Sequence, residues 1–197
     1  MAHYCIHCGA QLVEREIDGR VLEACPNDDF VLWRDPKVAT AVVVEVDGGI
    51  VLGRRAIEPA LGHWCLPGGF VNDDEGPMDA AARECLEEIG ASVVVAGLVG
   101  VYHIAKRGAP SMIAIGYRAR VVEGTHLAPG AEMLELQVFP ATSLPELAFP
   151  SHQQIVGDYV RSLASREEGE PRPAGATARR ASPPSRARGR SRPRRTR

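Results

Sequence analysis

Residues 69–91 read GFVNDDEGPMDAAARECLEEIGA, and this stretch decides the fold. Gly76-Pro77 suits a helix start, because a proline at the first helical position has no N–H group to leave unpaired. Gly90 suits the end of the same helix, since glycine readily adopts the left-handed conformation that closes a last turn. Between them, apolar residues recur at helical spacing. The expected buried side of this helix consists of Met78, Ala82, Cys85, Leu86 and Ile89.

Three acidic side chains gather on the other side of the predicted helix. Glu84, Glu87 and Glu88 are three or four residues apart, which makes them neighbours on the helix surface. Arg83 is the only cation near them in the sequence. Packed carboxylates repel one another unless a hard cation neutralises them, and Mg²⁺ and Mn²⁺ prefer such oxygen ligands. The pattern therefore favours a metal site, with a solvated acidic face as the alternative.

The spacing within this stretch points to a known family. Its fixed positions are Gly69, Glu75, Arg83, Glu84, Glu87, Glu88 and Gly90. They match the signature of the Nudix hydrolases, Gly-x5-Glu-x7-Arg-Glu-U-x-Glu-Glu-x-Gly-U, in which U is a bulky aliphatic residue. Cys85 and Ala91 depart from it at two U positions. The resemblance covers residues 38–164, and its further motifs are similar to those of the ADP-ribose/FAD pyrophosphatase type.

The resemblance implies both a fold and a reaction. The fold is α/β, the Nudix α/β/α sandwich with a mixed sheet between helices. The reaction is hydrolysis of the pyrophosphate bond in a nucleoside diphosphate linked to another moiety, of the ADP-ribose or FAD type. Mg²⁺ or Mn²⁺, held by Glu84, Glu87 and Glu88, is the implied cofactor. The residues implied as catalytic are Glu84, Glu87, Glu88, Arg83 and Glu135.

Roles and alternatives remain open at this stage. Arg83 would orient the carboxylates, Glu75 would support the start of the helix, and Glu135 is favoured over Glu132 as the base. An NADH pyrophosphatase is one alternative, although the Ser-Gln-Pro-Trp-Pro-Phe-Pro stretch of those enzymes is missing from residues 92–120. A catalytically silent nucleotide-binding regulator is another, which the intact glutamates disfavour.

The implied partner is a small dinucleotide, with a homodimer as an open possibility. The residues expected to contact substrate are Arg54, Arg55, Gly68 and Gly69, with Lys106 and Arg107 as weaker candidates. The two strand-end arginines offer positive charge to a phosphate or carboxylate, and the glycines let the backbone come close to a ligand.

Residues 1–35 read as a small metal-stapled knuckle, similar to the N-terminal zinc ribbon of one Nudix branch. Cys5 and Cys8 form a CxxC turn, and Cys25 follows after a short hairpin. Asp28 stands where a fourth cysteine is usual, and carboxylates are occasional zinc ligands. The predicted Zn²⁺ ligands are Cys5, Cys8, Cys25 and Asp28, with His7 or His3 as substitutes for Asp28. A ribbon that has lost its metal is the alternative.

Residues 36–164 form the predicted hydrolase domain. Apolar runs rich in β-branched residues predict its strands, and Asp47-Gly48-Gly49 predicts a hairpin turn between the first two. The predicted strands are 38–46, 50–55, 92–102, 111–122 and 134–139, and the predicted last helix is 151–164. The strands at 92–102 and 111–122 are expected to be buried.

Residues 165–197 are predicted to be a disordered tail, because their Arg, Pro, Ser and Ala content shows no periodicity. The chain holds 23 basic and 25 acidic residues, and ten of the basic ones are arginines within 172–197. An acidic body thus precedes a basic tail. A solvated tail is favoured over an arm that binds nucleic acid.

The remaining composition bounds the class of protein. No apolar run approaches the roughly 20 residues that span a bilayer, and the N-terminus lacks a signal-peptide apolar region. A cytoplasmic protein without a membrane partner is the expectation. Five cysteines in such a protein favour metal or thiol roles over disulfides.

Overall fold

The computed structural model describes residues 2–105 and 110–169, and it contains two separate sheets. The larger sheet has the strand order β6-β5-β4-β8-β7, with β9 paired to β5. Its strands are β4 (Lys37–Val46), β5 (Gly49–Arg55), β6 (Trp64–Cys65), β7 (Val93–Ile104), β8 (Met112–Val121) and β9 (Met133–Phe139). β4 and β8 run parallel and the other pairs are antiparallel, so the predicted mixed sheet is confirmed.

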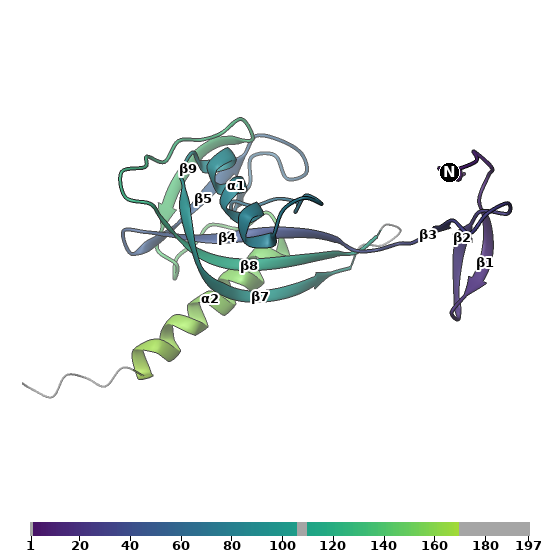
Figure 1. Cartoon of the computed structure of the whole chain (residues 1–197). Coiled ribbons are helices and arrows are strands. Elements are labelled where there is room, and N and C mark those ends of the chain that lie inside the picture. Colours follow the sequence, from purple (N-terminus) through teal and green to yellow (C-terminus); the bar gives the residue numbers. More distant parts are fainter. Residues whose placement is uncertain (1, 106–109, 170–197) are drawn as a thin grey trace, which may run out of the picture.

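Two helices cover the larger sheet, α1 (Pro77–Ile89) and α2 (Pro150–Gly169) (Figure 1). Successive residues of β4 point to opposite faces, so Val42 packs in the core under α1 while Val43 packs in the core under α2. A strand buried on both faces reads as a continuous apolar run, which explains the sequence of β4. The sandwich of helix, mixed sheet and helix is as predicted.

The predicted ends of α1 are confirmed. Gly76 is the N-cap residue, Pro77 follows it, and Gly90 closes the helix with φ 68° while its N–H bonds the carbonyl of Leu86. The predicted buried side is wrong in part, because Met78 and Leu86 are 51% and 53% exposed.

The helix is turned so that its small residues face the sheet. Ala81 and Cys85 pack there with Ile89, and Glu88 is only 5% exposed. The rotation follows from the site described below, where Glu88 bonds the backbone of a neighbouring turn. Apolar spacing alone placed Glu88 on the opposite side.

Two other elements differ from the sequence predictions. β7 is an edge strand rather than a buried one, and Val94, Leu98 and Val101 are each about three-fifths exposed. α2 continues to Gly169, beyond the predicted end at 164. The rest of the predicted tail, residues 170–197, and the candidates Lys106 and Arg107 lie outside the described residues.

The smaller sheet contains β1 (Val13–Ile17), β2 (Arg20–Ala24) and β3 (Val31–Leu32), and it is set apart from the larger body (Figure 1). Its own core is small and is built around Cys5, Leu12 and Cys25. In the described part of the chain, no helix has the length and apolarity needed to cross a membrane.

Candidate active site and metal centre

The turn 66–69, which leads out of β6, brings a backbone donor to the acidic helix. The N–H of Gly68 donates a hydrogen bond to Oε2 of Glu88 at 2.8 Å. Gly68 has φ 147°, and a Cβ there would lie 2.2 Å from the carbonyl oxygen of Thr40 on β4. Only glycine fits this turn against β4, and the close approach is what aims the N–H at Glu88.

Gly69 is required for a different reason. A Cβ at Gly69 would lie 2.4 Å from Oε1 of Glu84, so the missing side chain leaves the space that this carboxylate occupies. Gly68 and Gly69 were predicted as substrate contacts, and the structure gives both of them a packing role beside the glutamates.

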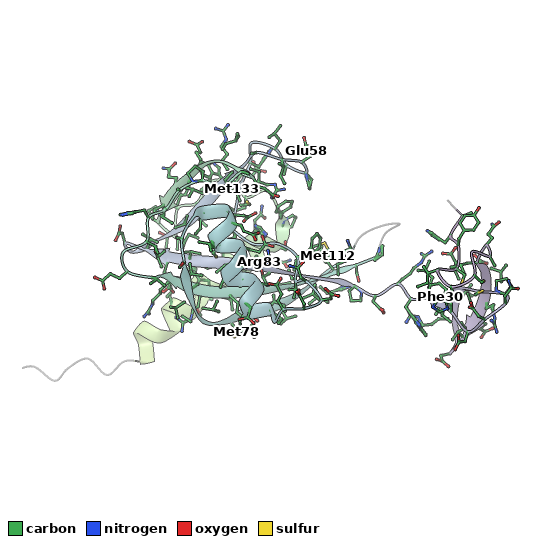
Figure 2. The ribbon with its side chains drawn as sticks, turned by 45° about the horizontal axis from the view of Figure 1, so that its top comes forward. Phe30, Glu58, Met78, Arg83, Met112 and Met133 are labelled. Atoms are coloured by element: carbon green, nitrogen blue, oxygen red, sulfur yellow. The ribbon has the colours of Figure 1, made fainter. Side chains whose placement is uncertain are left out.

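Arg83 is the hub of the site and projects from the middle of α1 (Figure 2). Its Nη1 donates to Glu84 at 2.8 Å and to Glu87 at 3.1 Å. Its Nε and Nη2 grip both oxygens of Glu75 at 3.0 and 2.6 Å, and Nη2 also donates to the carbonyl oxygen of Phe70. Such forked pairing fixes carboxylates in direction as well as in charge.

Arg83 also keeps Glu75 ionised. The bonds from Arg83 lower the pKa of Glu75 to about 2, with the N–H of Asn72 as a further donor. Glu75 therefore stays ionised and locks the loop before α1 onto the helix. The hydrogen bonds to Glu75 and Glu84 in turn raise the pKa of Arg83.

Two of the glutamates carry a charge that burial disfavours. Burial is the main cause that raises the pKa of Glu84 and the pKa of Glu88, the latter to about 7, and smaller contributions come from the negative charges of neighbouring carboxylates, among them Glu132. The hydroxyl of Thr40, buried on β4, also has no hydrogen-bond partner among the described residues. Neighbouring carboxylates that burial makes costly to ionise fit a divalent cation, which would share their negative charge.

The strand-end arginines of β5 behave differently from each other. Arg54 is paired across the ladder with Glu135, at 2.9 Å, and also donates to the carbonyl oxygen of Gly62. Arg55 is half-buried, and its positive charge lowers the pKa of Glu88. The charge of Arg55 thus acts on Glu88, whereas Arg54 is held by Glu135 and by the carbonyl oxygen of Gly62.

Of the two acids Glu132 and Glu135, only Glu132 affects the pKa of Glu84 and Glu88. Its charge acts on Glu84 and Glu88, and its carbonyl oxygen accepts the N–H of Ala56, next to Arg55. Glu135 is the acid of this pair that the family resemblance favours as the base, yet the carboxylate of Glu135 is held by Arg54. The pairing of β5 with β9 places Glu135 opposite Arg54, and no local sequence pattern reveals this pairing.

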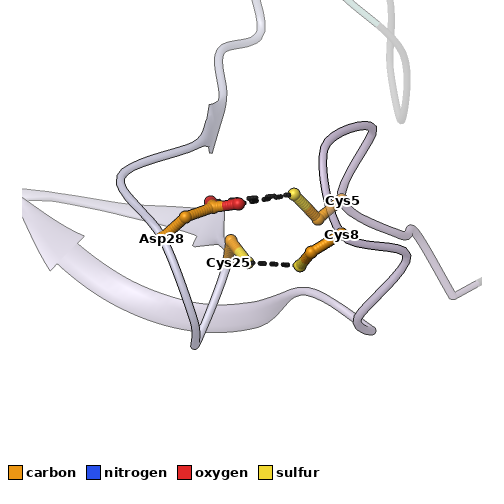
Figure 3. A group of neighbouring side chains, drawn as sticks. All are labelled: Cys5, Cys8, Cys25 and Asp28. Carbon is orange, nitrogen blue, oxygen red and sulfur yellow. Dashed lines mark hydrogen bonds between the residues drawn. The ribbon is translucent and has the colours of Figure 1, made fainter.

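The second cluster lies in the N-terminal knuckle (Figure 3). Ligand atoms of Cys5, Cys8, Cys25 and Asp28 all lie within 4.8 Å of one another. The sulfurs of Cys8 and Cys25 are 3.4 Å apart, and Sγ of Cys5 is 3.3 Å from Oδ2 of Asp28. All of the cysteines are free thiols.

The backbone around the knuckle favours negative sulfur. The N–H groups of His7 and Asn27 point at the sulfurs of Cys5 and Cys25, at 3.3 and 3.4 Å. His3, a candidate substitute ligand, instead bonds Glu23 at 2.9 Å. The predicted set of three cysteines and Asp28 is therefore brought together by the fold.

The profile of the NUDIX domain matches residues 35–159, which is more than half of the chain. The chain belongs to the Nudix family. An ADP-ribose pyrophosphatase of Methanocaldococcus jannaschii is 37% identical over 133 residues, which cover 67% of this chain and 78% of that protein. An NAD-capped RNA hydrolase NudC of Pseudomonas syringae is 24% identical over 176 residues, covering 86% of this chain and 58% of that protein.

Solved Nudix structures agree with the fold. The crystal structure of a Nudix hydrolase from Nitrosomonas europaea superposes with a TM-score of 0.73 at 30% identity, covering 85% of this chain and 94% of that one. The chain is therefore a pyrophosphohydrolase of the Nudix family, a family that depends on divalent cations and acts on nucleotides.

Proposed function

We propose that the chain hydrolyses the pyrophosphate bond of a nucleoside diphosphate linked to a second moiety, with ADP-ribose as the first candidate substrate. The observation that carries this proposal is the buried Glu88, which accepts the N–H of Gly68 and lies near enough to Glu84 for the charge of Glu84 to raise its pKa. The 37% sequence identity to an ADP-ribose pyrophosphatase supports this class of substrate.

Each residue of the cluster has a distinct task in this proposal. Glu84 and Glu88, with Glu87 at the exposed rim, hold Mg²⁺ or Mn²⁺. Such a cation, when bound, neutralises bridging phosphates and activates water. Arg83 sets the direction of the carboxylates, and Glu75 holds Arg83 in place from the loop side.

A general base must lie near the cluster and be free to accept a proton. We infer that Glu132 takes this role rather than Glu135, because the charge of Glu132 acts on Glu84 and Glu88. Arg55 is the matching candidate for contact with a substrate phosphate, since its charge also reaches Glu88.

A ring beside the cluster offers a place for a base to stack. Phe70 follows Gly69, is 48% exposed, and has Nζ of Lys37 5.0 Å from its ring centre. Two other aromatic candidates are less accessible, since Tyr102 donates to Asp158 and the half-buried Phe149 contacts both Arg55 and His152. Phe70 is therefore our candidate for stacking on the nucleobase.

Two alternatives are kept as outcomes of the test. The similarity to NudC supports dinucleotide or capped substrates of the NAD type, although the chain spans little more than half of that relative's length. A silent regulator is disfavoured, because Glu84, Glu87 and Glu88 are all intact and Arg83 holds two of them together with Glu75.

The test is a panel of ADP-ribose, FAD, NADH and nucleoside triphosphates, each with Mg²⁺ or Mn²⁺. We expect cleavage of ADP-ribose and a loss of more than about 10³-fold in kcat for Glu88→Gln, which keeps the acceptor for Gly68 but removes the charge. Asp79→Asn is the matched control, because it removes an exposed charge from the same helix. Full turnover in Glu88→Gln would contradict the site.

We also propose that the knuckle binds one zinc ion through three thiolates and the carboxylate of Asp28. The support is the convergence of these four groups and the N–H groups directed at two of the sulfurs. Three cysteines with one carboxylate supply the four ligands that a structural zinc ion takes.

Metal analysis of the purified chain tests the zinc proposal. We expect about one zinc per chain, lost in Cys8→Ser and reduced in Asp28→Asn, with a lower melting temperature after chelation. Glu16→Gln is the control, because Glu16 is an exposed carboxylate of β1 that belongs to neither group of potential ligands, the second being His7, Asp28 and Asp29. Zinc content that survives Cys8→Ser but is lost in Asp29→Asn would show that the ion is bound at the second group.

A further inference from the structure

A histidine of α2 holds the turn that carries Gly68. Nδ1 of His152 accepts a hydrogen bond from the backbone N–H of Leu66 at 3.1 Å. Leu66 is only 1% exposed, so its N–H has no access to water and needs a partner in the protein. The contact joins residues that are distant in sequence, and it requires a neutral ring with its proton on Nε2.

The turn 66–69 is fixed from the opposite side by β4. The N–H of Val42 donates to the carbonyl oxygen of Pro67, and the N–H of Thr40 donates to that of Gly69, both at 2.8 Å. These bonds fix the middle and the end of the turn. The bond from Leu66 to His152 fixes its beginning.

The N–H of Gly68 lies between these anchors and points at Glu88. We propose that His152 is a positioning residue for hydrolysis, which fixes the backbone at Leu66 and thereby aims the N–H of Gly68 at Glu88. The inference rests on the proposed function, in which Glu88 is a ligand of the cation. His152 does not touch the reacting atoms in this account.

The surroundings of His152 keep its ring neutral, the form in which Nδ1 can accept the hydrogen bond from Leu66. Burial, with a smaller contribution from the positive charge of Arg55, lowers the pKa of His152 to about 4. Phe149 packs edge-on against the ring, with centroids 5.0 Å apart. An apolar side chain at this position would leave the N–H of Leu66 without a hydrogen-bond partner, which is rare for a buried amide.

The binding of Mn²⁺ alone, followed by electron paramagnetic resonance at neutral pH, tests this role without any substrate. We expect His152→Leu to bind Mn²⁺ about tenfold more weakly, the scale seen when support of a metal ligand is lost. His152→Asn should restore the affinity to within about twofold, because the Asn Oδ1 can stand in for Nδ1 as acceptor. With ADP-ribose, kcat should fall in His152→Leu while KM stays nearly constant.

Gln153→Leu is the matched control on the same helical turn. Gln153 donates to the carbonyl oxygen of Leu147 at 3.3 Å, so its loss removes a comparable bond that does not reach the turn 66–69. We expect the Mn²⁺ affinity of this variant to equal that of the natural chain. An equal loss in Gln153→Leu and His152→Leu would overturn the positioning role.

Two further results would overturn the positioning role of His152. Unchanged Mn²⁺ affinity in His152→Leu, or an equal loss in His152→Asn, overturns the proposal. If His152→Leu does not fold by circular dichroism, His152→Gln replaces it, because glutamine carries its acceptor one bond further away and should bind Mn²⁺ more weakly than His152→Asn does. If the natural chain binds Mn²⁺ but cleaves no substrate of the panel, the proposed function is refuted. The Mn²⁺ affinities of the His152 variants then still test whether His152 positions the turn.

Discussion

At the scale of single residues, the site is a balance of charges that one arginine organises. Arg83 compensates Glu75 fully and Glu84 in part, and it does not reach Glu88 in any bond the structure shows. Glu88 instead has the N–H of Gly68. A buried carboxylate with one neutral donor remains costly to ionise, and it gains from a cation that shares the charge.

This balance predicts how pH acts on stability. In the folded chain the pKa of Glu88 is about 7, against 4.5 for an unperturbed glutamate. Between these values the folded state binds a proton that the unfolded state has released, so without divalent ions the free energy of unfolding falls as pH rises through this window. The size of the effect is about 3 kcal/mol.

The measurement is chemical denaturation in a chelator, at about pH 5 and about pH 8, for the natural chain and for Glu88→Gln. Glutamine does not titrate, so the variant should lack this part of the decline. Denaturation midpoints that change in parallel for both proteins would show that Glu88 ionises normally in the fold.

At the scale of elements, the turn 66–69 packs directly against α1, through Gly68 on Glu88 and Gly69 on Glu84. The two adjacent glycines serve different neighbours, since Gly68 lies against the backbone of Thr40 and Gly69 lies against the side chain of Glu84. Backbone cannot yield to a new methyl group as easily as the end of a flexible side chain can. The two positions should therefore respond differently to alanine.

We expect Gly69→Ala to fold with nearly natural stability but to lose about 10- to 100-fold in kcat, because Glu84 must move. Gly68→Ala should lower the melting temperature clearly, because its Cβ would lie 2.2 Å from a backbone oxygen at a φ of 147°. Thermal unfolding and steady-state kinetics on both variants check this. Equal losses of stability would show that Glu84 is as rigidly held as β4.

At the scale of the whole molecule, the charge is divided between the folded body and the sequence that follows it. The ten arginines of 172–197 leave 13 basic against 25 acidic residues in the rest of the chain. Because the proposed site lies in the acidic part, we expect the basic segment to contribute nothing to hydrolysis of a small dinucleotide at physiological salt, where long-range fields are screened.

Removal of 171–197 tests this division. We expect kcat/KM for ADP-ribose to stay within about twofold, while any salt-dependent binding to single-stranded RNA disappears. RNA binding that persists after the deletion would place the contact in the folded part, and a large fall in kcat/KM would assign the segment a role in hydrolysis.

The sequence by itself determined the helix at 77–89, the family, and the identity of the acidic residues, because these depend on spacing along one element and on local turn chemistry. It also identified the cysteines and the aspartate that meet in the knuckle. Their spacing within two short turns leaves few ways to arrange them.

Only the tertiary structure decided which acid is buried and which second acid acts on the cluster. Glu88 was placed on an exposed face because helical periodicity ranks side chains by polarity, and it cannot foresee a backbone donor from another turn. Glu132 and Glu135 are distinguished by the pairing of β5 with β9, and the support from His152 depends on α2 packing across the sheet from α1. These contacts join segments that are distant in sequence, so their geometry exists only once the sheet has formed.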